Sequence, residues 1–205
     1  MQILLLKKKG RYYFIKMSGI DSLYRIHPDT MFQFSLYEGK EFNEDEWSEF
    51  RIFNEYAFAW ESALRMLSIR AHCERDMRNK LRKKKFSTLS IEKVLEECKR
   101  LQLVDDVNFA RIYISELKEK GMGRQMIKVK LSGKGVGREI IEEELECSFS
   151  EDDELSAAES ALKKKILSLK RESNPLKRKE KFCRYMASRG FGYDVINELV
   201  GRLDE

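Results

Sequence analysis

The spacing of hydrophobic residues divides the chain into a short β-rich start and a long helical remainder. Within residues 1–27, three apolar and aromatic stretches, QILLL, RYYFIKM and SLYRIH, are separated by KKKG and SGID. Runs of this kind, bounded by Gly, Ser and Asp, favour strands, so we expect a small β-hairpin or three-stranded meander with a turn at KKKG. A sheet of this size is too small to be stable alone and must pack against another part of the chain.

The pattern changes after this predicted sheet. The stretch DTMFQFSLYEGKEFNEDEWSEF is interpreted as two short helical turns joined at Gly39. From about residue 51 onward, apolar residues recur at spacings of three and four, as at Trp60 and Leu64, which is typical of an amphipathic helix. We therefore expect residues 1–54 to form an N-terminal segment of strands and short helices.

The remainder of the chain contains an internal repeat. Three segments superpose without a gap: LRKKKFSTLSIEKVL from Leu81, LSGKGVGREIIEEEL from Leu131 and MASRGFGYDVINELV from Met186. Each opens on an apolar residue, has another five positions later, and has a basic residue three positions after the opening one. These basic residues are Lys84, Lys134 and Arg189. The pattern predicts a helix that ends at a basic turn and a second helix that packs back onto the first.

A further helix-length amphipathic stretch precedes each copy, so the repeat is a unit of three helices. We expect these units at residues 55–104, 105–148 and 151–204. Residues that cap helix N-termini mark three of the helix starts, namely Asp105-Asp106, Glu151–Glu154 and Asn174-Pro175. The predicted fold is mainly α, an elongated and curved array of three tandem three-helix repeats preceded by the small sheet.

The composition agrees with a helical protein. The 205 residues include only 2 Pro and 11 Gly, too few for a sandwich or barrel of many short strands. Charged residues make up 37%, which indicates a large solvated surface around thin cores. No apolar run approaches the roughly 18 residues of a membrane span, and QILLL is followed by KKK rather than by a signal-peptide core, so we expect a cytoplasmic protein.

The residues that carry chemistry do not form a recognisable active site. Cys73, Cys98, Cys147 and Cys183 are far apart and lack a CxxC spacing, so we expect four reduced and mostly packed thiols. His72 is interpreted as a surface or capping residue. The GMG and GKGVG stretches lack the flanking features of a phosphate-binding loop and are interpreted as helix ends. We expect no enzymatic activity, no metal and no cofactor.

Positive charge is concentrated in three blocks that follow the repeat. Residues 65–85 hold nine basic residues against two acidic ones, residues 118–138 hold seven against one, and residues 163–189 hold eleven against two. Residues 139–159 hold ten acidic residues and no basic one. Equivalent positions in an array form a continuous stripe, which suits a nucleic-acid backbone and gives affinity largely independent of sequence. A merely solvated basic face is the alternative interpretation.

Aromatic residues contribute little to this predicted surface. Tyr193 lies off the apolar stripe and is the candidate for stacking on a base. The aromatic residues assigned mostly to the core are Phe86, Phe109, Tyr113, Phe182, Tyr185 and Phe191.

Three stretches carry a resemblance to a known family: ALRMLSIRAHCERDMRNKLRKKKF, LVDDVNFARIYI and GMGRQMIKVKLSGKGV. They are similar to a helix ending in leucine-serine-x-arginine, an aspartate pair before phenylalanine-alanine, and a lysine-glycine turn. In these features the chain resembles the RecX family of bacterial recombination regulators, over residues 55–147 and, through the internal repeat, over residues 148–205. It departs from the family at three positions, where a capping serine, a helix-ending glycine and an arginine are usual: Cys73, Gln102 and Asn108.

The resemblance implies a non-catalytic modulator in homologous recombination, DNA repair and the SOS response. Such a protein binds the filament that the RecA recombinase forms on DNA, lies along its groove, and limits recombinase and coprotease activity. We expect a monomer with weak, sequence-independent binding to single-stranded or double-stranded DNA and no membrane partner. The candidate residues for this surface are Arg70, Arg78, Lys80, Arg82, Lys84, Arg124, Lys128, Lys134, Arg184 and Arg189. The acidic runs Glu142–Glu144 and Glu151–Glu154 are candidates for protein contacts, although complementarity to helix N-termini accounts for much of this charge.

A second hypothesis is a tandem helix-turn-helix-like protein that acts on duplex DNA by itself, as a repressor. Base-specific readout would distinguish this protein from a filament-binding modulator. The sequence offers no clear recognition helix rich in Asn, Gln and Arg, which favours the filament hypothesis.

Overall fold

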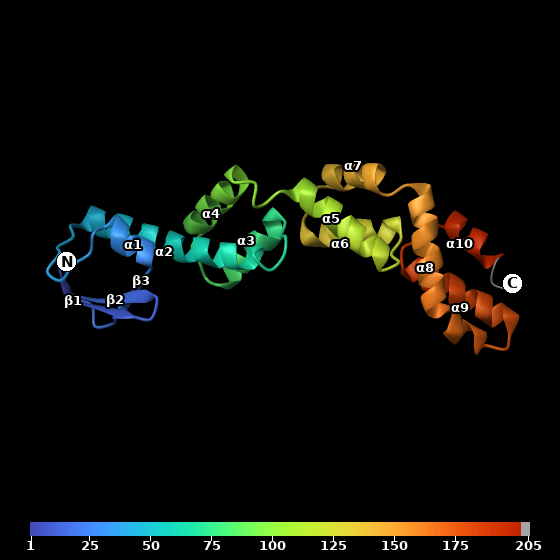
Figure 1. The fold of residues 1–205 in the computed structure, drawn as a ribbon, viewed down its shortest axis with the longest axis horizontal. Helices are drawn as coiled ribbons and strands as arrows, with labels where there is room; N and C mark the ends of the chain where they lie inside the picture. The colour runs from blue at the N-terminus through green and yellow to red at the C-terminus, as the bar shows by residue number, and fades with distance from the viewer. Residues whose placement is uncertain (202–205) are drawn as a thin grey trace. The chain divides into compact units, whose positions relative to one another are not determined.

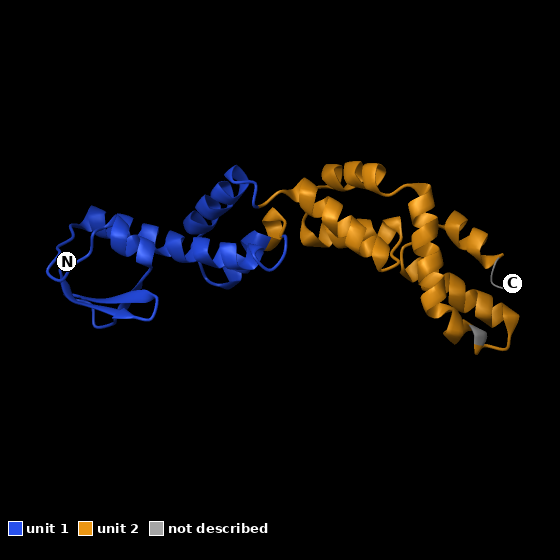
Figure 2. Cartoon of the chain, in the orientation of Figure 1, with its two compact units in different colours: residues 1–71, 77–103 blue, residues 72–76, 104–205 orange. Residues whose placement is uncertain are grey.

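The computed structural model describes residues 1–201, apart from the side chain of residue 170. The chain forms two compact units (Figure 2). Unit 1 comprises residues 1–71 and 77–103, and unit 2 comprises residues 72–76 and the chain from Val104 onward. The expectation of a mainly α protein is confirmed, because ten helices and three strands make up the described elements (Figure 1).

Unit 1 begins with the predicted β-meander. Strands β1 (Ile3–Lys9), β2 (Tyr12–Met17) and β3 (Tyr24–Ile26) form an antiparallel sheet in the order β1-β2-β3. The turn between β1 and β2 is shorter than KKKG, because the three lysines belong to β1 and pair with β2. Gly10 makes the turn possible by adopting a positive φ of 62°.

One short helix and one long helix follow the sheet. Helix α1 spans Pro28–Gln33, and helix α2 spans Glu44–Leu67. The interpretation of this region as two short helical turns joined at Gly39 is therefore wrong for the second turn. Asn43 and Glu46 form a capping box that starts a helix of 24 residues, and nothing interrupts it at residue 54.

The sheet packs against the first half of α2. Ile15, Met17 and Ile26 are buried in one cluster with Trp47 and Phe50 of α2. The rings of Trp47 and Phe50 stack with centroids 5.1 Å apart. This burial gives the small sheet the support that it lacks by itself.

A buried side-chain amide fixes the sheet relative to α2. The Asn54 side chain accepts a hydrogen bond from the backbone N–H of His27 at 2.9 Å. It also donates one to the carbonyl of Arg25 at 3.0 Å. These bonds satisfy the backbone at the end of β3, where a further strand would otherwise be needed.

The first repeat shares α2 with the N-terminal segment. The second half of α2 is followed by α3 (Glu74–Lys83) and α4 (Thr88–Arg100). Glu55 of α2 accepts hydrogen bonds from the Ser87 amide at 3.0 Å and the Ser90 hydroxyl at 2.7 Å, at the start of α4. Partial burial would raise the pKa of Glu55, but the hydrogen bonds from the two serines outweigh it and hold this pKa below its usual value.

Unit 2 contains the second and third repeats. The second consists of α5 (Asp106–Glu119), α6 (Arg124–Lys134) and α7 (Arg138–Ser148). The third consists of α8 (Glu151–Lys170), α9 (Pro175–Ser188) and α10 (Tyr193–Val200). The predicted helix starts are confirmed, with N-caps at Asp105, Ser150 and Asn174.

The backbone confirms the alignment of the three copies. The opening residues Leu81, Leu131 and Met186 are all fully buried. Four positions later, the backbone of each copy turns through a residue with positive φ. The φ angles are 66° at Lys85, 95° at Gly135 and 86° at Gly190. The same left-handed turn therefore joins the second and third helices of every repeat, and the first repeat makes it without glycine.

The turn of the third repeat packs on the start of α6 in the second repeat. The Gly123 amide donates to the Arg189 carbonyl at 3.0 Å, and the Gln125 amide donates to the Gly190 carbonyl at 3.1 Å. These are first-turn amides, which have no acceptor within their own helix. We call this contact the inter-repeat joint.

Residues 72–76 make an equivalent joint with the second repeat inside unit 2. The Cys73 thiol donates to the Lys134 carbonyl at 3.2 Å, and Lys134 is the repeat equivalent of Arg189. The Glu74 amide donates to the Asp106 carboxylate at 2.8 Å, as the Arg124 amide donates to Glu154 at 3.2 Å. An acidic residue at the start of one repeat thus caps a helix of the repeat before it.

Neighbouring repeats share a hydrophobic core in unit 2. One hydrophobic cluster joins Leu131, Leu145 and Phe149 of the second repeat to Phe182 and Met186 of the third.

Among residues 1–201, no helix is both long and apolar enough to cross a lipid bilayer.

The inter-repeat joint leaves no space for a side chain at Gly190. A Cβ there would lie 2.6 Å from the Cβ of Met126 and still closer to its backbone nitrogen. We expect Gly190→Ala to destabilise the protein by about 2 kcal/mol or more, because both the positive φ and the backbone contact oppose it. Urea unfolding followed by circular dichroism measures this change.

Gly133→Ala is the matched control, because a Cβ at Gly133 meets nothing within 4 Å. Gly133 lies inside α6, so alanine there should stabilise the protein by about 0.5–1 kcal/mol. Equal unfolding midpoints for the two variants would contradict the close backbone contact that we describe at Gly190.

Candidate nucleic-acid interface

The candidate basic residues of the first repeat lie on α3 and its flanking turns. Arg70 is exposed in the turn after α2, and Arg82 and Lys84 are exposed at the end of α3 and in the turn that follows. Arg78 and Lys80 are half-buried within α3. The structure thus brings four of the five candidates, those from Arg78 to Lys84, onto one helix and its turn.

Arg78 also has a structural role. Its guanidinium forms an ion pair with Glu92 of α4. The repeat equivalents of these two residues are Lys128 and Glu142, and the charge of Lys128 contributes to lowering the pKa of Glu142, after the larger effect of Arg138. A basic residue on the second helix therefore faces an acidic residue on the third in both repeats, which reduces the positive charge available to a ligand.

Arg124 is directed largely at the protein itself. Its Nη2 atom donates to the Leu145 carbonyl at 3.3 Å and to the Phe149 carbonyl at 2.7 Å. These carbonyls lie at the C-terminal end of α7, where the Leu145 carbonyl also accepts the backbone amide of Phe149 at 3.1 Å. Arg124 thus closes the C-terminal end of α7 from the start of α6.

Arg189 joins the third repeat to the second. Its Nη1 atom donates to the Lys120 carbonyl at 3.0 Å, at the end of α5. The same guanidinium lies over the ring of Tyr185, 5.3 Å from the centroid. The candidate turn residues therefore differ, since Lys84 is exposed whereas Lys134 and Arg189 are half-buried.

The third repeat contains a basic groove between α8 and α9. Lys165, Lys181 and Arg184 line it together with Tyr185, and its volume is about 540 Å³. The Lys165 amine lies 5.4 Å from the centroid of the Tyr185 ring. Lys181 pairs with Glu172, and Arg184 pairs with Glu180 on its own helix.

Sequence reasoning missed three basic residues near the candidate surface. Lys165 and Lys181 line the basic groove with Arg184, and both fall within the third block of positive charge. Lys130 is the repeat equivalent of Lys80, so the alignment of the copies is sufficient to identify it. The groove pair requires knowledge of how α8 packs on α9, which the alignment does not contain.

The aromatic assignments agree with the structure. Phe109, Phe182 and Phe191 are buried, and Tyr185 is half-buried. Tyr193, the candidate for base stacking, is 76% exposed at the first position of α10.

Several members of the acidic runs Glu142–Glu144 and Glu151–Glu154 have roles within the protein, and Asp153 agrees with the explanation by helix N-termini. Glu144 is buried and accepts two hydrogen bonds from Arg111, at 3.0 and 3.1 Å. Asp153 completes the capping box of α8 and pairs with Lys118 at 2.8 Å. These carboxylates stabilise helix ends and helix packing, so they are not available to a partner.

The interpretation of His72 as a surface residue is also wrong. Its side chain is buried, and Nδ1 lies 2.8 Å from the Asp76 carboxylate one turn along the chain. The neighbouring Cys73 thiol is buried too, and burial raises its pKa. A raised pKa makes this thiol a weaker nucleophile near neutral pH. Within residues 1–201, no cluster of three or more His, Cys, Asp or Glu side chains could hold a metal ion.

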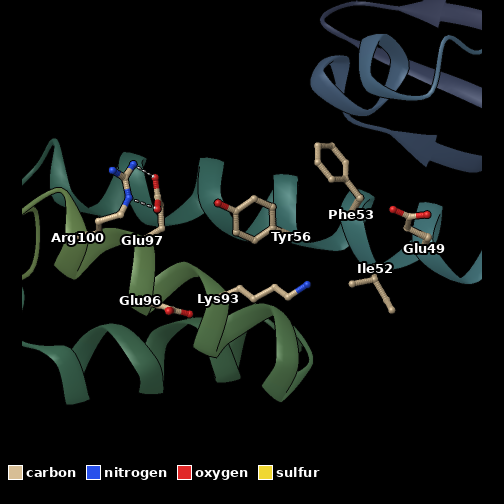
Figure 3. A pocket seen from close by; sticks show the side chains of 8 residues that line it. All are labelled: Glu49, Ile52, Phe53, Tyr56, Lys93, Glu96, Glu97 and Arg100. Atoms are coloured by element: carbon tan, nitrogen blue, oxygen red, sulfur yellow. Dashed lines mark hydrogen bonds and ion pairs between the residues drawn. The ribbon is translucent and has the colours of Figure 1, made fainter.

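A second groove, of about 390 Å³, lies in unit 1 between α2 and α4 (Figure 3). Tyr56 of α2 and Lys93 of α4 face this groove, beside the ion pair of Glu97 with Arg100. Burial and the charge of Glu97 raise the pKa of Tyr56, so its hydroxyl stays protonated. The groove contains neither His nor Cys nor Ser, and it holds none of the candidate basic residues.

The geometry thus consists of three-helix repeats with a common basic turn, and three family models match those repeats. They are described as the first, second and third three-helix domains of RecX, and they match residues 59–98, 105–145 and 151–200. The chain belongs to the RecX family. The alignment of the three copies therefore coincides with the family's own division into domains.

Several relatives named regulatory protein RecX match most of the chain. The protein from Clostridium acetobutylicum is 32% identical over 185 residues, which cover 88% of this chain and 86% of the relative. The protein from Clostridium beijerinckii is 29% identical over 180 residues, with 88% and 84% coverage. The protein from Streptococcus uberis is 28% identical over 207 residues, with 99% and 77% coverage. The relatives support a regulatory role for this chain.

Two solved structures share the fold. A crystal structure of regulatory protein RecX matches with a TM-score of 0.70 and 23% identity, over 100% of this chain and 99% of that one. The RecX structure from Lactobacillus salivarius matches with a TM-score of 0.63 and 22% identity, over 73% of this chain and 97% of that one.

The two carbonyl contacts of Arg124 predict a structural role that a lysine cannot fill. We expect Arg124→Lys to destabilise the protein by about 2 kcal/mol, because the lysine amine lacks the planar guanidinium whose Nη2 atom reaches both carbonyls. Thermal or urea unfolding measures the change. Gln125→Ala, at the next and exposed position, should alter stability by less than about 0.5 kcal/mol. An Arg124→Lys variant as stable as the parent would show that the guanidinium is free for a ligand.

Proposed function

We propose that this RecX-family protein is a non-catalytic regulator that binds the RecA recombinase filament on DNA and limits its recombinase and coprotease activities. It acts in the cytoplasm as a monomer, within homologous recombination, DNA repair and the SOS response. The observation that carries the proposal is the repetition of a basic turn, at Lys84, Lys134 and Arg189, in three domains of a family named for regulation.

Repetition suits a ligand that is itself a repeating polymer. A filament presents the same protein surface and the same phosphate spacing at regular intervals, so several weak sites can engage it together. Linked weak sites gain affinity from effective concentration, without any single strong contact. An elongated arrangement of the repeats along the filament groove is part of this proposal.

Two surfaces hold the basic residues that we assign to the polyanion. The first is the exposed end of α3, where Arg82 and Lys84 have no carboxylate within ion-pair distance among the described residues. The second is the basic groove of the third repeat, with Lys165 and Arg184. Point charges of this kind attract phosphates with little sequence preference. Of the other candidates, Arg124 and Arg189 bond carbonyls of the protein itself. Further positive charge in the first two repeats comes from Arg70, Arg78, Lys80, Lys128 and Lys134.

Inhibition of RecA tests the proposal directly. We expect the full-length protein to lower the ATPase activity of RecA filaments on single-stranded DNA and to slow strand exchange. Lys165→Gln with Arg184→Gln should raise the concentration for half-inhibition about tenfold, because one of several linked sites no longer binds. Lys163→Gln with Lys179→Gln removes the same charge from exposed positions of α8 and α9 that do not line the groove.

Two results would reject parts of the proposal. If the parent protein leaves RecA unaffected but binds duplex DNA, the filament role fails and the repressor hypothesis replaces it. If both double variants weaken inhibition equally, net charge rather than the groove determines binding.

A further inference from the structure

The N-terminal sheet is strongly positively charged, although it lies outside the three basic blocks. Residues 1–27 contain six Lys and Arg residues and a single acidic residue, Asp21. The family models begin at residue 59, so they do not cover this sheet. The charge therefore calls for an explanation separate from the repeats.

Strand register places much of this charge on one face. Ile15 and Met17 of β2 are buried against α2, so the residues between and beside them point to the opposite, outer face. Lys7 of β1 lies opposite Phe14 of β2, and Phe14 lies opposite Arg25 of β3. These three side chains form one row across the outer face, with neighbouring Cβ atoms about 5 Å apart.

Two further cations extend this row. Lys16 lies two positions from Phe14 along β2, and Lys9 lies two positions from Lys7 along β1, so both share the outer face. The result is a phenyl ring with lysines beside it on β1 and β2 and with Arg25 opposite it on β3. We call the set Lys7, Lys9, Phe14, Lys16 and Arg25 the sheet platform.

The charges of the sheet platform are not neutralised within the protein. Among the described residues, Lys7, Lys9 and Lys16 make no ion pair or side-chain hydrogen bond. The Arg25 guanidinium is exposed and lies over the rings of Phe58, at 4.2 Å, and Tyr12, at 4.9 Å, rather than beside a carboxylate. The platform differs in this from the third-repeat groove, where Glu172 and Glu180 already pair with two of the cations.

Phe14 gives the platform a flat apolar centre. Its side chain is half-buried and does not belong to the hydrophobic core that the sheet forms with α2. An unpaired base can stack on such a ring while its neighbouring phosphates contact the surrounding lysines. A paired base in a duplex cannot reach the ring, because its faces are covered by the stack.

We propose that the sheet platform binds single-stranded nucleic acid, with one base stacked on Phe14 and the backbone held by Lys7 and Lys16. This site goes beyond the proposed function, which concerns the three repeats. It gives the N-terminal segment a role next to the filament, where single-stranded DNA is the polymer that RecA occupies.

Fluorescence anisotropy of the full-length protein with a labelled oligothymidine of about 20 nucleotides tests this site. We expect Phe14→Leu, which keeps an apolar side chain and removes the ring, to weaken binding about fivefold or more. Binding to a duplex of the same length should not change. Lys7→Gln with Lys16→Gln should reduce the slope of log affinity against log salt by about 1.4, since each lysine that no longer meets a phosphate lowers it by about 0.7.

Lys8→Gln with Arg51→Gln is the control, because it removes the same number of positive charges from positions outside the sheet platform. Lys8 lies over Tyr13 on the inner side of the sheet, and Arg51 is exposed on α2. An equal change of slope in the two double variants, or an unchanged affinity of Phe14→Leu for the oligonucleotide, would overturn the proposal. Weaker binding of the platform variants to anionic lipid vesicles but not to the oligonucleotide would also overturn it, in favour of a membrane surface.

Photo-crosslinking of the parent protein keeps the test independent of how the variants fold. An oligonucleotide that carries 5-iodouracil should form an adduct at Phe14 that mass spectrometry locates. Adducts confined to the three repeats would overturn the platform. Because these measurements contain no RecA, their outcome is separate from that of the filament proposal.

Discussion

The structure of unit 2 depends on one contact. The left-handed turn at Gly190 in the third repeat packs against the first turn of α6 in the second repeat. A helix N-terminus offers amides that its own backbone cannot bond, and the turn offers carbonyls that need donors. At Gly123 and Gly190 the two backbones approach so closely that neither position tolerates a Cβ. The contact combines hydrogen bonding, close packing and a left-handed backbone, so it fixes both the spacing and the rotation of neighbouring repeats. The basic residues before the turns of the second and third repeats, Lys134 and Arg189, are thereby held at equivalent places.

The protein uses its charged residues in two distinct ways. Many of them join helices, as when Arg124 closes α7, Lys118 bonds the Ser148 carbonyl, and Arg111 pairs with the buried Glu144. Half-buried contacts of this kind contribute to stability and subtract from the charge that a ligand meets. The lysines of the sheet platform have no such partners among the described residues. Counts of charged residues along the sequence cannot distinguish these two uses. They therefore predict Arg124 as a ligand contact and do not identify the sheet platform.

The repeated architecture is predictable because it depends on local spacing. Apolar residues at Leu81, Leu131 and Met186, with a turn at a fixed distance after each, are enough to define the three copies in the sequence. The length of α2 is not predictable from Gly39, because the capping box at Asn43 starts the helix only four residues later. The role of Asp106 requires the neighbouring repeat, since its carboxylate accepts from the Glu74 amide of the repeat before it. Side chains that act between repeats are therefore the ones that sequence reasoning misassigns.

Amide hydrogen exchange at the start of α6 tests the inter-repeat joint most directly. Amides in the first turn of a helix ordinarily exchange fast, because they lack an acceptor. The Gly123 and Gln125 amides donate to carbonyls of the third repeat, whereas Glu139 holds the same position in α7 as Gln125 in α6 and is exposed. The account predicts that Gly123 and Gln125 are protected about a thousandfold or more relative to Glu139, at the level of the buried core. Exchange of Gly123 and Gln125 at the rate of Glu139 would contradict it.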